Sequence, residues 1–396
     1  MSPKISEVDL LITGAGPAGL MAAAWASRCS LKTRIIDEKD TRVRTGQADG
    51  LHCRTLEIMD SFGSPSIAHE ILGQACNPKE GHEQHIERSE SVRSGEEDLP
   101  GSRYPQLHVE EASVDDHDAY PVEIHLRGLG KNERAGSPDS EAAQKPATEI
   151  VRAKYVLGTD GAHSWTRKAL GLQMEGDTTN KHFGVMDFIP LSNFPDIRIS
   201  CAIHSSSGSI MTLPRENGLV RFYVQLGESS VQGSNFDRSK VTPDDIIETS
   251  RKILQPYTLD YGHCDWFSVY TVGQRLAQSF SHLDRVFLAG DAVHTHSPTM
   301  GAGMNVSMQD SYNLIWKIAT AIRTRNTSIL ATYNTERMVT AKELIDKDRA
   351  MSNFYCDGPS ANSKRYQEFR EAFRDFVSGV AVEYGPSQNW HISTPL

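Results

Sequence analysis

The beginning of the chain alternates between apolar runs and a helical pattern. Val8–Ile12 is a short apolar run, Leu20–Ala26 is rich in alanine, and Thr33–Ile36 is a second short run with β-branched residues. Short apolar runs are typical of buried strands, and an alanine-rich segment between them favours a helix. The pattern therefore predicts a strand, a helix and a second, parallel strand at the start of the chain.

The turn between the first strand and the helix reads Gly-Ala-Gly-Pro-Ala-Gly. Its glycines permit a tight turn and let a pyrophosphate approach the backbone at the start of the helix. The candidate binding residues of this turn are Gly14, Gly16, Pro17, Ala18 and Gly19. Asp37 and Glu38 end the second strand about 20 residues later, where a carboxylate binds ribose hydroxyls, and Asp37 is preferred because Glu38 points to the opposite face. The alternative is an ordinary strand–helix turn with incidental glycines.

The middle of the chain alternates between apolar and polar residues as a sheet does. Ser209–Leu213 and Leu219–Leu226 flank an Asn-Gly dipeptide, which predicts a hairpin. Thr242 is the expected N-cap, and Pro243 the first residue, of a helix that runs to about Leu254. The remaining predicted elements are a helix over Leu51–Phe62, strands over Val122–Leu126, Glu149–Leu157 and Arg285–Ala289, and an amphipathic helix over Met304–Ile322.

Composition divides the chain further. Residues 76–103 are dominated by Lys, Glu, His, Arg, Ser and Gly, which predicts a disordered surface excursion. Residues 132–145 repeat this composition at the tip of a predicted hairpin. We therefore expect a discontinuous nucleotide-binding domain over residues 1–62, 104–175 and 284–355, a second domain over 176–283 and a C-terminal tail over 356–396.

Composition and charge also narrow the classes of partner. The 396 residues are 38% hydrophobic, enough to bury a sizeable core, and the net charge of −10 disfavours nucleic acid and anionic membrane surfaces. The chain shows no signal-peptide pattern and no apolar run of about 20 residues, so we expect a cytoplasmic location and no membrane partner. Six scattered cysteines indicate reduced thiols. His82 and His85 lack further ligands nearby in the sequence, so no metal site is expected.

Two further glycine-containing segments follow later predicted strands. Gly158-Thr-Asp-Gly161 follows one strand, and Gly290-Asp291 follows another. Pro298-Thr-Met-Gly-Ala-Gly-Met-Asn305 then leads into the long helix. The first turn alone serves NAD as readily as FAD, but the three segments together, in this order, predict one bound FAD.

These segments resemble the phenol hydroxylase (phenol 2-monooxygenase) branch of the class A flavin-dependent aromatic hydroxylases. The resemblance rests on residues 45–56, 155–167, 210–225 and 285–298. It implies an α/β fold in which a Rossmann-like FAD-binding domain of the glutathione reductase type is interlocked with an α+β substrate domain. It also implies a monooxygenase that uses FAD, NAD(P)H and O2 to hydroxylate a phenolic or polyketide-derived aromatic compound, in secondary metabolism or aromatic degradation. Since only one glycine turn has strand–helix context, NAD(P)H is expected to bind between the domains.

The resemblance assigns roles to the later segments. Asp160 matches the aspartate of the family's Asp-Gly motif, which is associated with FAD and NADPH, and Asp291 matches the aspartate that binds ribitol. The loop and helix start beside the flavin pyrimidine correspond to Pro298, Gly301, Ala302, Gly303, Met304 and Asn305. Backbone N–H groups there, together with the helix dipole, would stabilise negative charge on the reduced flavin.

Asp49 and Tyr223 are the candidate catalytic residues. Asp49 shares a loop with Gly46 and Gln47, which are expected to contact FAD, and it matches the aspartate that assists deprotonation of the phenol. A phenolate is more reactive than a phenol, so a base beside the hydroxyl matters. Tyr223 is expected to line the substrate pocket on the same strand face as Arg221. The alternatives are that Asp49 caps the following helix and that Tyr223 only packs in the core.

The chain departs from this family in three places. It is shorter between Gly63 and Pro121, and Lys181 and His182 stand where the family often has a tyrosine. It ends at Leu396 without the thioredoxin-like domain that phenol hydroxylases use in dimer contacts, so a homodimer stays an open expectation. A flavin oxidase or halogenase-like enzyme, and a flavin-binding protein with a structural or regulatory role, are the alternatives to a hydroxylase.

Overall fold

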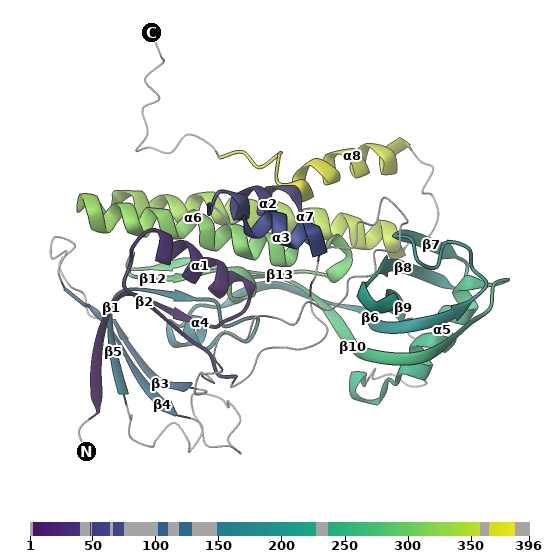
Figure 1. The fold of residues 1–396 in the computed structure, drawn as a ribbon, viewed down its shortest axis with the longest axis horizontal. Helices are drawn as coiled ribbons and strands as arrows, with labels where there is room; N and C mark the ends of the chain where they lie inside the picture. The colour runs from purple at the N-terminus through teal and green to yellow at the C-terminus, as the bar shows by residue number, and fades with distance from the viewer. Residues whose placement is uncertain are drawn as a thin grey trace, which may run out of the picture.

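The computed structural model describes residues 3–39, 48, 50–63, 66–74, 102–109, 119–128, 149–226, 237–356 and 364–384. Gly46, Gln47 and Asp49 lie outside these residues, as do residues 76–101 of the predicted excursion and the hairpin tip at 132–145. The described residues form two β-sheets covered by helices (Figure 1). The α-helices are α1 (Pro17–Arg28), α2 (Cys53–Asp60), α3 (Ile67–Gln74), α4 (Trp165–Ala169), α5 (Pro243–Leu254), α6 (Gly303–Thr324), α7 (Ala331–Cys356) and α8 (Lys364–Ser378).

The first sheet contains the predicted parallel strands. Its strands are β1 (Lys4–Thr13), β2 (Thr33–Ile36), β3 (Ser102–Val109), β4 (Val122–Gly128), β5 (Glu149–Gly158), β11 (Ser281–His282) and β12 (Val286–Leu288). β2, β1, β5 and β12 run parallel in that order, β4 pairs antiparallel with β5 and β3 with β4, and β11 pairs antiparallel with β12. Leu10, Leu11 and Ile12 of β1 are completely buried. A central parallel strand covered on both faces requires such a continuous apolar run.

The second sheet is antiparallel at each of its strand pairs. Its strands are β6 (Met174–Ser192), β7 (Cys201–Ser205), β8 (Gly208–Pro214), β9 (Val220–Leu226), β10 (Leu259–Ala277) and β13 (His294–Thr295), in the order β13-β10-β6-β9-β8-β7. The predicted hairpin of β8 and β9 is confirmed. The predicted helix that follows it is also confirmed: α5 runs from Pro243 to Leu254, and Thr242 and Asp245 form a capping box.

The two sheets exchange strands near the expected domain boundary at 283/284. The chain leaves β10, adds β11 and β12 to the first sheet, and then returns to pair β13 with the end of β10. β11 therefore belongs to the first sheet and β13 to the second, which is the reverse of what the predicted boundary implies. The reason is the length of β10, whose far end is still paired with β6 while Ala277 packs in the core of the first sheet (Figure 1).

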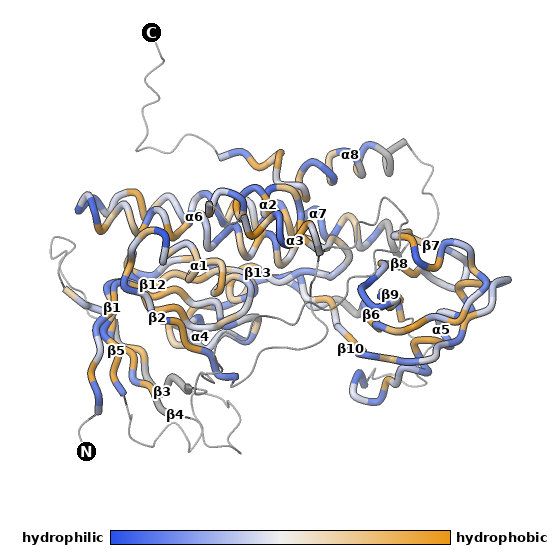
Figure 2. Tube along the Cα trace, in the orientation of Figure 1, coloured by the Kyte–Doolittle hydropathy of each residue, from blue (hydrophilic) through white to orange (hydrophobic). Residues whose placement is uncertain are grey.

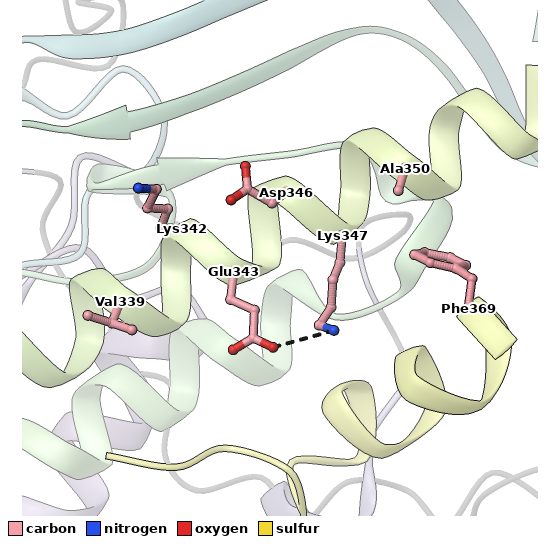
Figure 3. A pocket seen from close by; sticks show the side chains of 7 residues that line it. All are labelled: Val339, Lys342, Glu343, Asp346, Lys347, Ala350 and Phe369. Carbon is pink, nitrogen blue, oxygen red and sulfur yellow. Dashed lines mark ion pairs between the residues drawn. The ribbon is translucent and has the colours of Figure 1, made fainter. Parts of the chain in front are cut away.

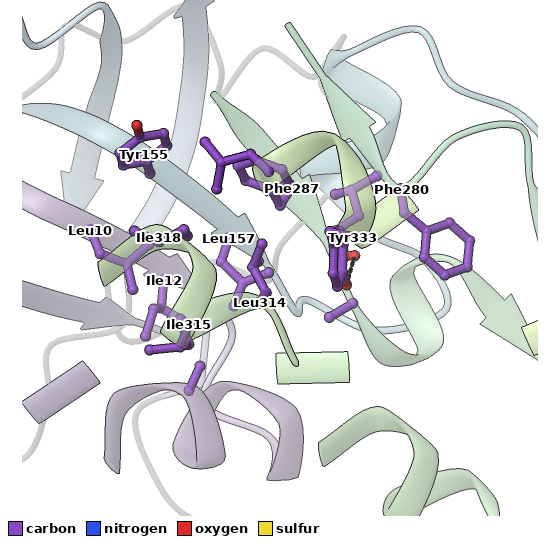
Figure 4. Packing of buried hydrophobic residues seen from close by; sticks show 14 of the residues in the cluster. Leu10, Ile12, Tyr155, Leu157, Phe280, Phe287, Leu314, Ile315, Ile318 and Tyr333 are labelled. Atoms are coloured by element: carbon purple, nitrogen blue, oxygen red, sulfur yellow. Dashed lines mark hydrogen bonds between the residues drawn. The ribbon is translucent and has the colours of Figure 1, made fainter. Parts of the chain in front are cut away.

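The main core lies between the first sheet and the long helices. It joins side chains of β1, β5 and β12 to one face of α6 and to Tyr333 of α7 (Figure 4). Figure 2 shows that the apolar residues concentrate in these strands and on the inner faces of the helices. The Tyr333 hydroxyl donates to the Leu288 carbonyl at 2.7 Å, and burial raises the pKa of this hydroxyl well above its ordinary value. α7 then continues past the first sheet to contact β8 and β10, so one helix spans both sheets.

Two predicted boundaries are wrong. The helix expected over Leu51–Phe62 begins at Cys53 and ends at Asp60, with His52 as its N-cap residue. The tail expected over 356–396 contains α8, whose Phe376 is buried in a cluster with Met300, Ala302, Val306 and Leu344. Apolar residues of α8 recur every three or four positions, at 366, 369, 373, 376 and 377, which is an amphipathic pattern that the description as a tail overlooked. None of the helices in the described part of the chain is long and apolar enough to cross a bilayer.

The main core makes the first prediction. Replacement of Phe287 by alanine should lower the free energy of unfolding by about 3–5 kcal/mol, because Phe287 is completely buried among residues of three elements. Phe267 of β10 is 39% exposed, so its replacement by alanine should cost less than about 1 kcal/mol. Urea unfolding followed by tryptophan fluorescence measures both. Equal midpoints for the two variants would contradict this description of the core.

Candidate functional site

Each of the three glycine-containing segments lies at the carboxyl end of a parallel strand of the first sheet. Gly14 follows β1, Gly158 ends β5, and Gly290 comes directly after β12 and Ala289. Because these strands are neighbours, the segments meet at one edge of the sheet. The crevice at the carboxyl ends of parallel strands is where open α/β sheets bind ligands.

The glycines of the first turn have different physical reasons to be glycine. Gly14 has a φ of +105°, and a Cβ there would lie 2.5 Å from the Thr159 carbonyl oxygen; a Cβ on Gly19 would lie 1.9 Å from the Gly14 oxygen. These two glycines are required by the packing of the protein itself. A Cβ on Gly16 would meet nothing within 4 Å. Gly16 is also the N-cap of α1 and forms no side-chain cap, so the helix N-terminus is open to an anion.

The other predicted residues of the turn also include exposed positions and positions that are buried against the protein. Pro17 is the exposed first residue of α1, whereas the Ala18 side chain is buried beside Gly290. Asp37 lies against the turn, where its Oδ2 accepts a hydrogen bond from the Ala15 N–H at 2.6 Å. Glu38 is exposed. The structure therefore brings Asp37 to the site.

The carboxylate of Asp160 is held by the start of α4. It accepts hydrogen bonds from the Ser164 hydroxyl at 2.5 Å and from the Thr166 N–H at 2.9 Å. Burial raises the pKa of Asp160, and these bonds oppose the effect. The side chain thus fixes the turn after β5.

Arg167 joins the second and third segments, a role that the sequence analysis missed. Its Nη1 donates to the Ala292 carbonyl at 2.7 Å, and its Nη2 donates to the Ala162 carbonyl at 3.0 Å. The signal for this residue was weak, because an arginine in the last turn of a helix is usually a solvated cap. Its side chain is instead almost completely buried.

The third segment presents a carboxylate to solvent. Asp291 is exposed, and within the described ranges its side chain forms no hydrogen bond. It follows Gly290, whose φ of +63° and close approach to Ser307 require glycine. A carboxylate held at this edge by a tight turn suits the hydroxyl groups of a sugar or ribitol chain.

The loop before α6 leads into a helix whose N-terminus has no side-chain cap. Gly301 has a φ of +60°, and Ala302 is the N-cap of α6 without a side-chain hydrogen bond to the first turn. Met304 is half-buried against Met21 and Ile58. The backbone N–H groups at the start of this helix of 22 residues therefore have no side-chain cap, and the positive end of its dipole faces the loop.

Asn305 connects this loop to the segment that follows Asp49. Its Oδ1 accepts from the His52 N–H at 2.9 Å, and its Nδ2 donates to the carbonyls of Gly50 at 2.8 Å and Gly301 at 3.3 Å. The Asn305 side chain is thus occupied by protein, which leaves only its backbone N–H for a cofactor. His52 makes a second connection through Nε2 and the Gly301 carbonyl at 3.1 Å, and burial lowers the pKa of its ring.

A buried carboxylate supports the third segment from below. Asp310 of α6 is completely buried and accepts from the Gly290 N–H at 3.1 Å, His294 Nε2 at 2.8 Å and Arg337 Nε at 2.7 Å. Burial alone would raise the pKa of Asp310, but the charges of Arg337 and His294 hold it below its ordinary value. Asp310 therefore stays ionised and fixes the backbone on which Asp291 stands.

A second buried carboxylate holds the other end of the same segment. Asp348 of α7 accepts from the Ser297 N–H at 2.8 Å and from Gln274 Nε2 of β10 at 2.6 Å. Residues 290–297 are thus fixed at one end by α6 and at the other by α7. The loop that leads into α6 starts from this fixed segment.

Tyr223 lies on the second sheet beside a buried ion pair. Arg221 Nε and Nη2 each donate to Asp187 at 2.7 Å, and Arg221 Nη1 lies 3.5 Å from the Tyr223 hydroxyl. The predicted shared face of Arg221 and Tyr223 is confirmed. Tyr223 is only 8% exposed, and it lies on the sheet face opposite to α5, which packs against Phe222 and Val224.

Two hollows of the described surface lie elsewhere. One of about 430 Å³ runs along α7 beside Phe369 of α8, where Glu343 and Lys347 form an ion pair at 3.4 Å (Figure 3). The other, of about 640 Å³, lies between α2, α6, α7 and residues 379–384. Neither is lined by the glycine-containing segments, so the position of the candidate site follows from those segments and the strand ends.

Comparison with known proteins also points to FAD. The sequence pattern of the family described as FAD binding domain matches residues 7–348. The chain is 39% identical to an FAD-dependent monooxygenase of Aspergillus thermomutatus, over 97% of this chain and 69% of the relative. It is 38% identical to a phenol 2-monooxygenase of Aspergillus fumigatus (98% and 67%) and 37% identical to a 3-hydroxybenzoate 4-monooxygenase of Comamonas testosteroni (96% and 66%). The chain spans about two thirds of the length of these relatives.

Solved structures share the fold. OxyS anhydrotetracycline hydroxylase from Streptomyces rimosus superimposes with a TM-score of 0.70 at 21% identity, over 98% of this chain and 78% of that one. The flavin-dependent monooxygenase PieE, solved with FAD and substrate, gives 0.65 at 19% identity, over 96% and 72%. At these identities the likeness is one of fold.

The open surface at Gly16 gives a prediction on cofactor binding. Gly16→Val should still fold, because a Cβ at this position has no protein atom within 4 Å, but it should lose FAD because the side chain occupies the path of the pyrophosphate. The wild-type protein should be yellow with one non-covalent FAD. Visible spectra after gel filtration, with circular dichroism as the folding control, measure this. A yellow Gly16→Val protein, or a wild type that cannot be reconstituted with FAD, would contradict the site.

Asp310 gives a prediction on stability and pH. Asp310→Asn should lower the free energy of unfolding at pH 7 by about 3–5 kcal/mol, because it leaves Arg337 buried without its counter-charge. Since the pKa of Asp310 is depressed in the folded state, its contribution is present above about pH 4 and is lost as the pH falls further. The gap between wild type and variant should therefore shrink on acidification. Urea unfolding at several pH values tests this.

The matched control is Asp346→Asn on α7, which removes an exposed ion pair with Arg349. It should change the free energy of unfolding by less than about 1 kcal/mol. A cost equal to that of Asp310→Asn would mean that burial of the pair is not the cause.

Proposed function

Because the chain belongs to the FAD-binding domain family of FAD-dependent aromatic monooxygenases, we propose that it hydroxylates a phenolic ring with NAD(P)H and O2. The overall change is that NAD(P)H, a proton, O2 and the aromatic substrate give the hydroxylated product, NAD(P)+ and water. The observation that supports the proposal most is the meeting of three distant glycine-containing segments at the carboxyl ends of β1, β5 and β12.

The same observation supports a finer description of the fold. We infer that the first sheet and its helices form a Rossmann-like FAD-binding domain of the glutathione reductase type. The second sheet is then the α+β substrate domain, and the exchange of β11 and β13 is the interlock between the two. Since the second sheet is antiparallel, NAD(P)H would bind between the domains rather than on a nucleotide-binding sheet of its own.

The residues present fit an FAD molecule. Gly16 and the N-terminus of α1 would receive the pyrophosphate, and Asp37 the ribose. Asp291 would bind the ribitol chain, and the uncapped start of α6 would lie at the flavin pyrimidine. When bound, FAD supplies the electrons taken from NAD(P)H and the position at which O2 is activated.

Asp49 is the residue that we assign to the substrate hydroxyl. Its neighbour Gly50 accepts a hydrogen bond from Asn305 Nδ2 at 2.8 Å, so Gly50 lies at the start of α6, beside the expected flavin pyrimidine. Its carboxylate would accept the phenolic proton and raise the electron density of the ring. Tyr223, on the face of the second sheet opposite to α5, would orient the same hydroxyl.

The experiment that tests the function is a screen of NADPH oxidation with a panel of phenols, followed by mass analysis of the products. Addition of one oxygen atom to a phenol supports the proposal. NADPH oxidation that yields only hydrogen peroxide would indicate an oxidase. A protein that binds FAD but oxidises no NADPH would favour a structural or regulatory role.

Asp49 gives the prediction for this step. Asp49→Asn should keep FAD but lower the rate of hydroxylation about 100-fold or more near neutral pH, because an amide cannot accept the phenolic proton. The rate should recover partly at a pH where the free substrate is itself ionised. Substrate-stimulated hydroxylation between pH 6 and about pH 10 measures this. Near wild-type rates at neutral pH would leave Asp49 with a structural role only. Helix capping by Asp49 is no longer the competing explanation, since α2 begins at Cys53 after His52.

A further inference from the structure

The ion pair beside Tyr223 is nearly sealed from water. The side chain of Arg221 is 1% exposed and that of Asp187 is 3% exposed. The pair is bidentate, with both Arg221 nitrogens at 2.7 Å from Asp187 oxygens, and the guanidinium lies 5.4 Å from the ring centroid of Trp266. Trp266, Asp187 and Arg221 are directly opposite one another on β10, β6 and β9. The three side chains therefore share the sheet face that bears Tyr223.

Two more charged residues adjoin this pair. Arg215 also contacts Asp187, at 3.2 Å, and pairs with Glu216 at 2.9 Å. Among these four described residues, the two arginines contribute +2 and the two carboxylates −2. The positive charge nearest to Tyr223 is thus already matched by a carboxylate of the protein.

We propose that Asp187 is a specificity-determining residue: by holding Arg221, it excludes phenols that carry a carboxylate and restricts the substrate to neutral phenols. This inference rests on the proposed function, since it takes Tyr223 to line the substrate pocket. An arginine on a pocket face would ordinarily be the group that recognises a carboxylate. In this protein the carboxylate bound by Arg221 is that of Asp187.

The physical basis is the cost of a second carboxylate. A benzoate that approached Arg221 would have to displace Asp187, which would leave a buried carboxylate without its cation, or share the guanidinium with it. Two carboxylates around one buried cation repel each other. A neutral phenol of the same size meets neither cost.

The test compares two ligands that differ mainly in charge, 3-hydroxybenzyl alcohol and 3-hydroxybenzoate. Titration calorimetry with the FAD-loaded full chain at pH 7 measures their dissociation constants. We expect the alcohol to bind about 100-fold more tightly, because a like charge placed beside a buried carboxylate costs binding free energy. Equal or tighter binding of 3-hydroxybenzoate, or binding of neither ligand, would overturn the inference.

Variants test whether Asp187 causes the preference for the alcohol. Asp187→Asn should reduce the ratio of the two dissociation constants by at least about tenfold, because Arg221 is then available to the benzoate carboxylate. Asp260→Asn, which removes an exposed partner of Arg251 on the same sheet, should leave the ratio unchanged. If Asp187→Asn does not fold, the double variant Asp187→Asn/Arg221→Gln removes both buried charges and should fold and keep the preference for the alcohol. A double variant that prefers 3-hydroxybenzoate would also overturn the inference.

Hydroxylation of both ligands is measured in parallel, so that the two proposals fail separately. Binding with the expected ratio but without hydroxylation of any phenol would reject the proposed function and leave the selectivity intact. Hydroxylation of 3-hydroxybenzoate at the rate of the alcohol would reject the selectivity and leave the function intact.

Discussion

The candidate site depends on the hydrogen bonds that the buried carboxylate of Asp310 accepts. This carboxylate links the turn after β12, the strand β13 and the helices α6 and α7 through Gly290, His294 and Arg337. Arg337 extends the connection to Tyr384 after α8, to whose hydroxyl it donates at 2.8 Å. A charge in such a place is tolerated only because each of its oxygens has a cationic or N–H partner. Its burial therefore forces four segments into one arrangement, and the exposed Asp291 is positioned as a consequence.

Above this fixed segment, some backbone groups of the site are available to a ligand. Gly14 and Gly19 are packed against other atoms of the protein. Gly16 has open space beside it, and the first N–H groups of α6 have no side-chain cap. α1 starts directly after β1, whereas α6 is held beside the end of β12 because Ser307 packs against Gly290 and Asp310 accepts a hydrogen bond from the Gly290 N–H. Two positive helix ends near one edge favour a ligand with phosphates and a ring that accepts negative charge.

The elements that could be predicted from the sequence are those whose signals are local. β2 and α5 begin and end where the pattern places them, because a capping box and a short β-branched run are complete within a few residues. The pairing of Asp310 with Arg337, and that of Arg167 with the Ala292 carbonyl, could not be predicted, since the partners are far apart in the chain and neither residue has a local motif. α8 was missed although its apolar residues recur every three or four positions, and its Phe376 packs against the loop before α6.

The two sheets use buried charge for different purposes. Under the first sheet, Asp310 and Asp348 each accept one backbone N–H, that of Gly290 and that of Ser297, besides their side-chain donors, and so fix the path of residues 290–297. On the second sheet, Asp187 accepts hydrogen bonds from the side chains of Arg221 and Arg215 within the described part of the chain. A carboxylate that accepts a backbone N–H fixes the path of the chain, whereas Asp187 holds two guanidinium groups and offsets their charge.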